Sequence, residues 1–163
     1  MDERADLIDF LWRTLGGVSD WVRFADAKAG AALAVDGVMV VLLAGRLTRT
    51  PAPGAFVAVI LSAALALAAV SALAAVWTVV PRMKRLGASA MIHYGTLASF
   101  DTAEACTAAF KAKLADPDEM ISVLTTQIWT LSRAADRKYK LVGTSVRLLA
   151  GALAVGLLGV LLG

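Results

Sequence analysis

A run of 27 residues without a single charge, from Gly54 to Val80, is the feature that most constrains how this chain can fold. As a helix that rises about 1.5 Å per residue, the run is ~40 Å long and can cross a bilayer with some tilt. Two other apolar stretches, Ala27–Gly45 and Leu141–Gly163, also have the length of a membrane span. We therefore predict an all-α integral membrane protein with three transmembrane helices.

The composition supports this class and argues against a soluble enzyme. The 163 residues suffice for one domain, and they are 59% apolar and 18% charged, whereas soluble domains are roughly 45–50% apolar and about 25% charged. A single cysteine, Cys106, excludes an internal disulfide, and a single histidine, His93, excludes a histidine-rich metal site. No nucleophile–base pair or phosphate-binding glycine loop stands out. We expect neither enzyme activity nor a cofactor.

The basic residues predict the orientation in the membrane. Residues 1–26 carry six acidic and three basic side chains, the reverse of a signal peptide, so we expect the first span to be retained. Residues 82–140 carry nine lysines and arginines, whereas the connector 46–53 carries two. The positive-inside rule then places the N-terminal region and residues 82–140 in the cytoplasm and Gly163 on the other side. The net charge of +3 is therefore better explained by topology than by a nucleic-acid partner.

The predicted order along the chain is an amphipathic helix at 1–18, spans at 19–45, 54–80 and 141–163, and a cytoplasmic helical sensing segment at 81–140. Gly16-Gly17 is expected to end the first helix, and Ser19 to cap the next one. The first helix could lie on the lipid headgroups or pack against the cytoplasmic helices, and the sequence leaves both open. Its apolar stripe consists of Leu7, Ile8, Leu11, Trp12 and Leu15.

Two helix starts are predicted in the cytoplasmic segment. Asp101, three residues before Glu104, has the spacing of a capping box and would open a helix to about Leu114. Asp116, followed by Pro117, is a stronger start signal. The helix after it has no stop signal before the third span, so one rod is expected to enter the membrane, with a bend near 143–145 and an Asp136–Lys140 pair on its exposed side. Its apolar seam consists of Ile121, Leu124, Ile128, Leu131 and Ala135.

Four short motifs in a fixed order resemble a known family. The motifs are WVRFADAKAGAALAVDG at 21–37, WTVVP at 77–81, HYGTLASF at 93–100 and QIWTLSRAADRKYKL at 127–141. Their order and spacing, over roughly residues 15–160, are similar to those of the Pycsar transmembrane effectors. One departure is Leu97, where the family has isoleucine.

This resemblance implies an antiphage effector at the bacterial inner membrane. A partner cyclase senses infection and makes cyclic UMP or cyclic CMP, and the effector responds by impairing the membrane and stopping growth. The family lacks the usual cyclic-nucleotide-binding β-roll, and no β-roll pattern is present in this sequence. A homo-oligomer is expected, because the three transmembrane helices of a single copy are too few to enclose a pore.

A cyclic mononucleotide needs cations or amides for its phosphate and a flat group for its base. Basic clusters lie at both ends of the cytoplasmic segment and could converge on one anion. For each of these lysines and arginines, the competing explanation is that it sets the membrane topology or contacts anionic lipid. For His93, packing is the simpler role. The candidate ligand residues are Arg82, Lys84, Arg85, Tyr94, Gln127, Trp129, Arg133, Arg137, Lys138 and Tyr139.

Three charged residues of the first span are candidates for gating. A carboxylate in mid-bilayer, as Asp36 would be, costs ~2.5–3.5 kcal/mol on insertion scales, so it should face water or a partner. It could line a pore, or it could be structural and bonded to a hydroxyl such as Ser62 or Ser71. Asp26 and Lys28, at the membrane edge, are expected to make structural pairs. Arg147 can extend its side chain toward the headgroups. The rival functions are a constitutive scaffolding subunit and a holin-like channel that needs no nucleotide.

Overall fold

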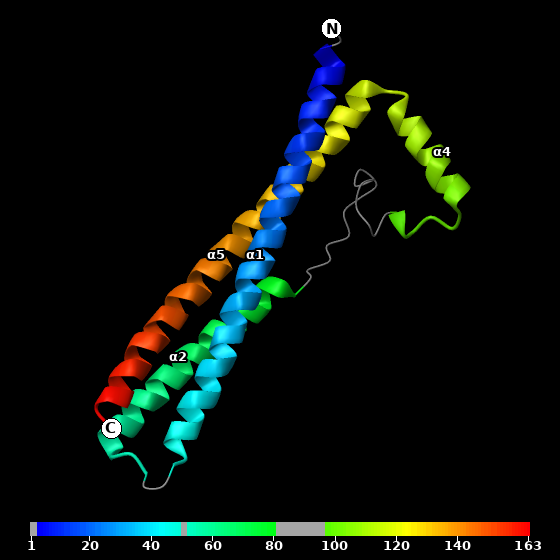
Figure 1. Ribbon diagram of the computed structural model, residues 1–163. Helices are drawn as coiled ribbons and strands as arrows, with labels where there is room; N and C mark the ends of the chain where they lie inside the picture. Colours follow the sequence, from blue (N-terminus) through cyan, green and yellow to red (C-terminus); the bar gives the residue numbers. More distant parts are fainter. Residues whose placement is uncertain (1–2, 50–51, 81–96) are drawn as a thin grey trace. The chain divides into compact units, whose positions relative to one another are not determined.

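The computed structural model describes residues 3–49, 52–80 and 97–163 (Figure 1). Within these ranges the chain forms four α-helices and no strand. Three of them, α1, α2 and α5, are long and apolar enough to cross a membrane. The all-helical class and the three candidate spans predicted from the sequence are thus confirmed. The helices are α1 (Glu3–Leu47), α2 (Ala55–Val79), α4 (Ala103–Leu114) and α5 (Pro117–Leu161).

Helix α1 is continuous, and the predicted break at Gly16-Gly17 is wrong. All residues from Glu3 to Leu47 are helical, and Ser19 caps nothing, because its hydroxyl donates to the carbonyl oxygen of Leu15 at 2.8 Å. A mid-helix serine commonly bonds one turn back in this way. Each glycine lowers helix stability by about 1 kcal/mol relative to alanine. Burial of Leu15 and Val18 on either side of the glycines offsets that loss, because packing contributes more to helix stability than propensity does.

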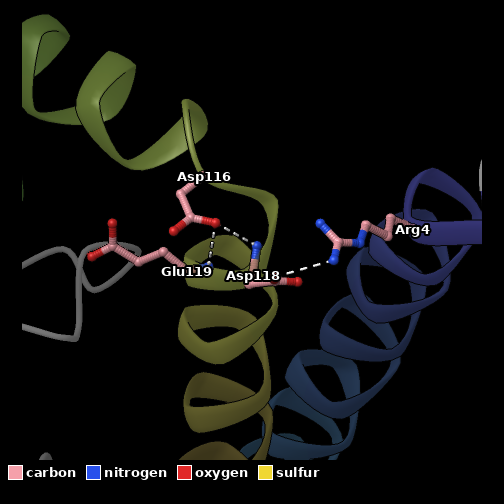
Figure 2. Close-up of polar contacts among 4 residues, drawn as sticks. All are labelled: Arg4, Asp116, Asp118 and Glu119. Atoms are coloured by element: carbon pink, nitrogen blue, oxygen red, sulfur yellow. Dashed lines mark hydrogen bonds and ion pairs between the residues drawn. The ribbon is translucent and has the colours of Figure 1, made fainter.

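Helix α5 begins as predicted (Figure 2). The Oδ1 atom of Asp116 accepts hydrogen bonds from the backbone amides of Asp118 at 2.9 Å and Glu119 at 3.4 Å. With Pro117 as its first residue, the helix runs to Leu161 without interruption, including residues 143–145. The expectation of one rod is therefore confirmed. The Asp136–Lys140 pair also forms, at 2.8 Å.

The cap of α4 differs from the prediction by one residue. Thr102, not Asp101, is the N-cap, and its hydroxyl oxygen accepts a hydrogen bond from the Ala105 amide at 3.1 Å. Thr102 has the extended backbone of an N-cap residue, with φ −140° and ψ 156°, which aims the side chain at the free amides of the first turn. A threonine next to an aspartate offers two possible caps, and a one-residue shift in the start of the helix decides between them.

The chain divides into two compact units. The described part of the first unit comprises residues 3–22 and 97–135. Here the first turns of α1 pack on α5 through an apolar core, and Arg4 makes a 3.4 Å ion pair with Asp118. Of the two placements left open for the N-terminal stripe, the structure shows packing against another helix, α5, with Leu7 and Trp12 more than 40% exposed. The core consists of Ile8, Leu11, Leu15, Met120, Leu124, Ile128 and Leu131.

The described part of the second unit comprises residues 23–49, 52–80 and 136–163. Its centre is one face of α2 whose buried residues follow one another at alternating spacings of four and three, the pattern of a narrow helix–helix seam. Small residues let the helices approach closely: a Cβ atom built on Gly159 would lie 2.8 Å from Leu61 Cδ2, and one on Gly156 would lie 3.3 Å from Leu43 Cδ2. The buried residues of α2 are Val57, Leu61, Ala64, Ala68, Ser71, Ala75 and Thr78.

Candidate functional site

A buried polar junction, formed by Asp36, Ser71 and Ser145, joins the three long helices of the second unit. All three residues have no exposed surface. The Ser71 hydroxyl donates to Asp36 Oδ2 at 2.8 Å. The same Ser71 oxygen lies 2.9 Å from the carbonyl oxygen of Ser145 and 3.1 Å from Ser145 Oγ. One residue from each of α1, α2 and α5 thus meets at a single point within the apolar part of the helices.

The sequence suggested two possible hydrogen-bond partners for Asp36, the hydroxyls of Ser62 and Ser71, and the junction shows which of them bonds to it. Ser71 lies on the buried seam of α2 and is the partner, whereas Ser62 lies on an exposed face. The contact of Ser145 with Ser71 was not anticipated, although Ser145 shares a buried stripe of α5 with Val142, Leu149 and Ala152. The position of Ser145 within this apolar stripe was the sequence signal that it faces the other helices. Asp36 Oδ1 is buried and has no hydrogen-bond partner among the described residues.

A second set of contacts joins α1 to α5 where the apolar part of each helix begins. Lys138 donates to Asp26 Oδ1 in an ion pair, and the Lys28 ammonium lies 5.3 Å from the centre of the Tyr139 ring, within cation–π range. We call these four residues the ionic clasp. The expected structural pairing of Asp26 and Lys28 is thus observed, and it involves two residues that were proposed as nucleotide ligands.

The remaining ligand candidates on α5 differ in accessibility. In the first unit, Trp129 is 62% exposed, and the Arg133 guanidinium lies 5.6 Å from the centre of its ring. Gln127 is buried, so it does not share the exposed face of Trp129. In the second unit, Arg137 is exposed. The candidates at the other end of segment 81–140, Arg82, Lys84, Arg85 and Tyr94, lie outside the described residues, as does His93.

Arg147 has the geometry expected of a cation inside a span. Its Nε donates to the carbonyl oxygen of Gly143 at 2.9 Å. The side chain therefore points back along α5, toward the end of the apolar stretch where the basic residues lie. This direction is typical of arginines that reach for the headgroups.

These features define a class of protein. The chain is a small all-helical protein with three helices able to cross a membrane, a carboxyl group bonded between them, and a basic helix that continues into one of them. Among the described residues, no three His, Cys, Asp or Glu side chains are grouped so that they could hold a metal ion.

The comparisons with known proteins agree with this class. Residues 10–163 match the family model described as "PycTM: Pycsar effector protein domain". The chain is similar to the "Pycsar effector protein PtPycTM" of Propioniciclava tarda, with 30% identity over 140 residues, which cover 83% of this chain and 69% of that protein. No solved structure gives a significant match.

The chain therefore belongs to the Pycsar effector family, and the resemblance seen in the sequence motifs is confirmed. Membership implies an antiphage effector that is activated by a cyclic nucleotide. The transmembrane effectors of this family are generally not enzymes.

Proposed function

We propose that this protein is an antiphage effector of the bacterial inner membrane, which cyclic UMP or cyclic CMP activates to impair the membrane and stop growth. The observation that carries the proposal is the continuity of α5. Four basic residues lie on this helix directly before the apolar stretch that starts at Leu141: Arg133, Arg137, Lys138 and Lys140. A ligand bound by these basic residues is thus connected to a membrane span by one continuous helix.

The proposed orientation places the N-terminal region and residues 82–140 in the cytoplasm and Gly163 outside. The excess of lysine and arginine in 82–140 over the connector 46–53 supports it. The direction of the Arg147 side chain, toward the basic end of the apolar stretch, also supports it. The basic cluster then faces the compartment in which a cyclase releases its product.

For the nucleotide, we propose that the cations of the cytoplasmic segment bind the phosphate and that an aromatic ring stacks on the base. Arg133, Arg137 and Lys138, with Arg82, Lys84 and Arg85, are the proposed phosphate ligands. Trp129, Tyr139 and Tyr94 are the rings proposed for the base; Trp129 is 62% exposed, and the Arg133 guanidinium lies 5.6 Å from the centre of its ring. Because the Gln127 side chain is buried, its amide would bond to a pyrimidine edge only after the packing around it opens.

The membrane effect is proposed to need several copies of the chain. Side chains fill the centre of the second unit, where Leu61, Ala64 and Ala68 are fully buried. A path for ions must therefore lie between copies or in disturbed lipid. Gly30 and Gly37 of α1 are exposed and have open space around them, which would let a helix of a second copy approach closely. In this proposal, the polar junction and the ionic clasp hold the resting arrangement.

A ligand activates such an assembly only if it binds the active state more tightly than the resting state. The test is calorimetry on the purified protein in detergent with cyclic UMP and cyclic CMP, together with dye leakage from liposomes that contain the protein. We expect heat of binding with one nucleotide, and leakage that depends on it. Neutralising Arg133, Arg137 and Lys138 together should abolish both, whereas the control Arg13→Gln with Lys111→Gln, at two exposed positions elsewhere, should change neither.

The rival functions give different results in the same assays. A constitutive scaffolding subunit would bind neither nucleotide, would leave liposomes intact, and would respond to the triple substitution only by a change of topology. A holin-like channel would release dye without any nucleotide. Absence of heat with both nucleotides at saturating concentration would refute the proposed function.

A further inference from the structure

The ionic clasp uses the same chemical groups that a cyclic nucleotide would need. Lys138 and Tyr139 are neighbours on α5, and they offer a cation for a phosphate and a ring for a base. In the structure both are occupied by α1: Asp26 binds the Lys138 ammonium, and the Lys28 ammonium lies over the Tyr139 ring. A carboxylate thus takes the place of a phosphate, and an ammonium takes the place of a base.

The charges and the exposure of the clasp favour exchange with an anion. Asp26, Lys28 and Lys138 together carry two positive charges and one negative charge, so one positive charge is left over. The phosphodiester of a cyclic mononucleotide carries a single negative charge. The side chains of Lys138 and Asp26 are 23% and 38% exposed. Their ion pair is therefore within reach of a solute, and water screening keeps it weak enough to be displaced.

We propose that the cyclic nucleotide replaces the two α1 partners: its phosphate takes Lys138 from Asp26, and its base takes the Tyr139 ring from Lys28. Binding then undoes the contacts between α1 and α5 at the point where both helices become apolar. The clasp disfavours the nucleotide in the resting state, and its opening couples binding to the movement of a span. This inference rests on the proposed function and adds to it the way in which the site is regulated.

The distinguishing test is the removal of the competitor. In the full-length Asp26→Asn variant no carboxylate competes for Lys138, so the affinity for cyclic UMP or cyclic CMP should rise about two- to fivefold, the range expected for loss of a partly exposed ion pair. Leakage from liposomes should begin at a correspondingly lower nucleotide concentration. A residue that merely stabilised the fold would not increase ligand affinity when it was replaced.

Asp9→Asn is the matched control. Asp9 is also an aspartate paired with a basic residue, Arg13, but the pair lies within α1 and its cation is not a proposed nucleotide ligand. Its replacement should leave the affinity unchanged. Asp26→Glu, which keeps the carboxylate, should behave like the wild-type protein. Lys138→Gln should lose binding at least tenfold, and Tyr139→Phe should bind normally whereas Tyr139→Leu should not.

A charge exchange keeps the test decisive if Asp26→Asn does not fold. In the double variant Asp26→Lys with Lys138→Asp, the ion pair is restored with reversed polarity, so the resting protein should be stable. Because a carboxylate now stands where the phosphate would bind, nucleotide binding should be lost. Wild-type affinity in this double variant would overturn the inference.

The outcomes separate this inference from the function on which it rests. If the wild-type protein binds a nucleotide, but Asp26→Asn binds no more tightly than Asp9→Asn, the exchange at the clasp is wrong and the proposed function stands. If the wild-type protein binds neither nucleotide, the proposed function is refuted and the inference is refuted with it.

Discussion

Replacement of Ser71 by alanine tests whether the polar junction holds the three long apolar helices together. The substitution removes the hydroxyl that donates to Asp36 Oδ2 at 2.8 Å and contacts Ser145. The carboxyl group has no exposed surface, and its other oxygen already lacks a partner among the described residues. The variant would therefore leave both oxygens of a buried carboxyl group without a partner in the described part of the chain.

The expected loss of stability follows from two sets of measurements. A buried polar group that loses its partner costs about 1–3 kcal/mol, while hydrogen bonds between membrane helices average about 0.6 kcal/mol and reach about 1.7 kcal/mol. Full burial of Asp36 places this case toward the upper end of the membrane range. We expect Ser71→Ala to lower the free energy of unfolding by about 1–2 kcal/mol, a five- to thirtyfold change in the folded-to-unfolded ratio.

The assay is reversible unfolding in mixed micelles as the fraction of denaturing detergent rises, followed by the helical circular dichroism signal. Ser62→Ala is the control, because Ser62 lies on an exposed face of the same helix, and it should change stability by less than about 0.5 kcal/mol.

The double variant Asp36→Leu with Ser71→Ala removes both partners, so its loss should be smaller than the sum of the two single losses. Equal stability of Ser71→Ala and Ser62→Ala, or strict additivity of Asp36→Leu and Ser71→Ala, would refute a bonded junction.

Four further variants test the packing and the helix start. Gly159→Ala should destabilise the second unit, because the new Cβ atom would lie 2.8 Å from Leu61 Cδ2. Gly151→Ala should be tolerated, because the atom nearest to its Cβ would be 3.9 Å away. Unfolding in mixed micelles compares the two variants, and equal stability would contradict close packing at Gly159. Asp116→Ala should cost about 1 kcal/mol and speed amide hydrogen exchange in the first turn of α5; unchanged exchange would argue against the cap. Leu124→Ala, at a fully buried position, should cost about 2–5 kcal/mol in the same unfolding assay, and a cost below about 1 kcal/mol would contradict the core of the first unit.

Features that depend on neighbours within one helical turn were predictable from the sequence. The uncharged run 54–80 predicted a span, and Asp116 followed by Pro117 predicted the start of α5, because both signals are local. Local signals also have limits: two glycines predicted a break in α1, and packing of Leu15 and Val18 keeps that helix intact.

The partners of the charged residues came only from the tertiary structure. The sequence named Ser62 and Ser71 as equal candidates for Asp36, and only the rotation of α2 about its axis, set by the packing of its seam, selects Ser71. The pair of Asp26 and Lys138 joins residues 112 positions apart. Hydropathy and capping are properties of adjacent residues, so they can be seen in the chain itself. Which side chains meet across helices depends on how whole faces pack, and that is decided only when the helices are assembled.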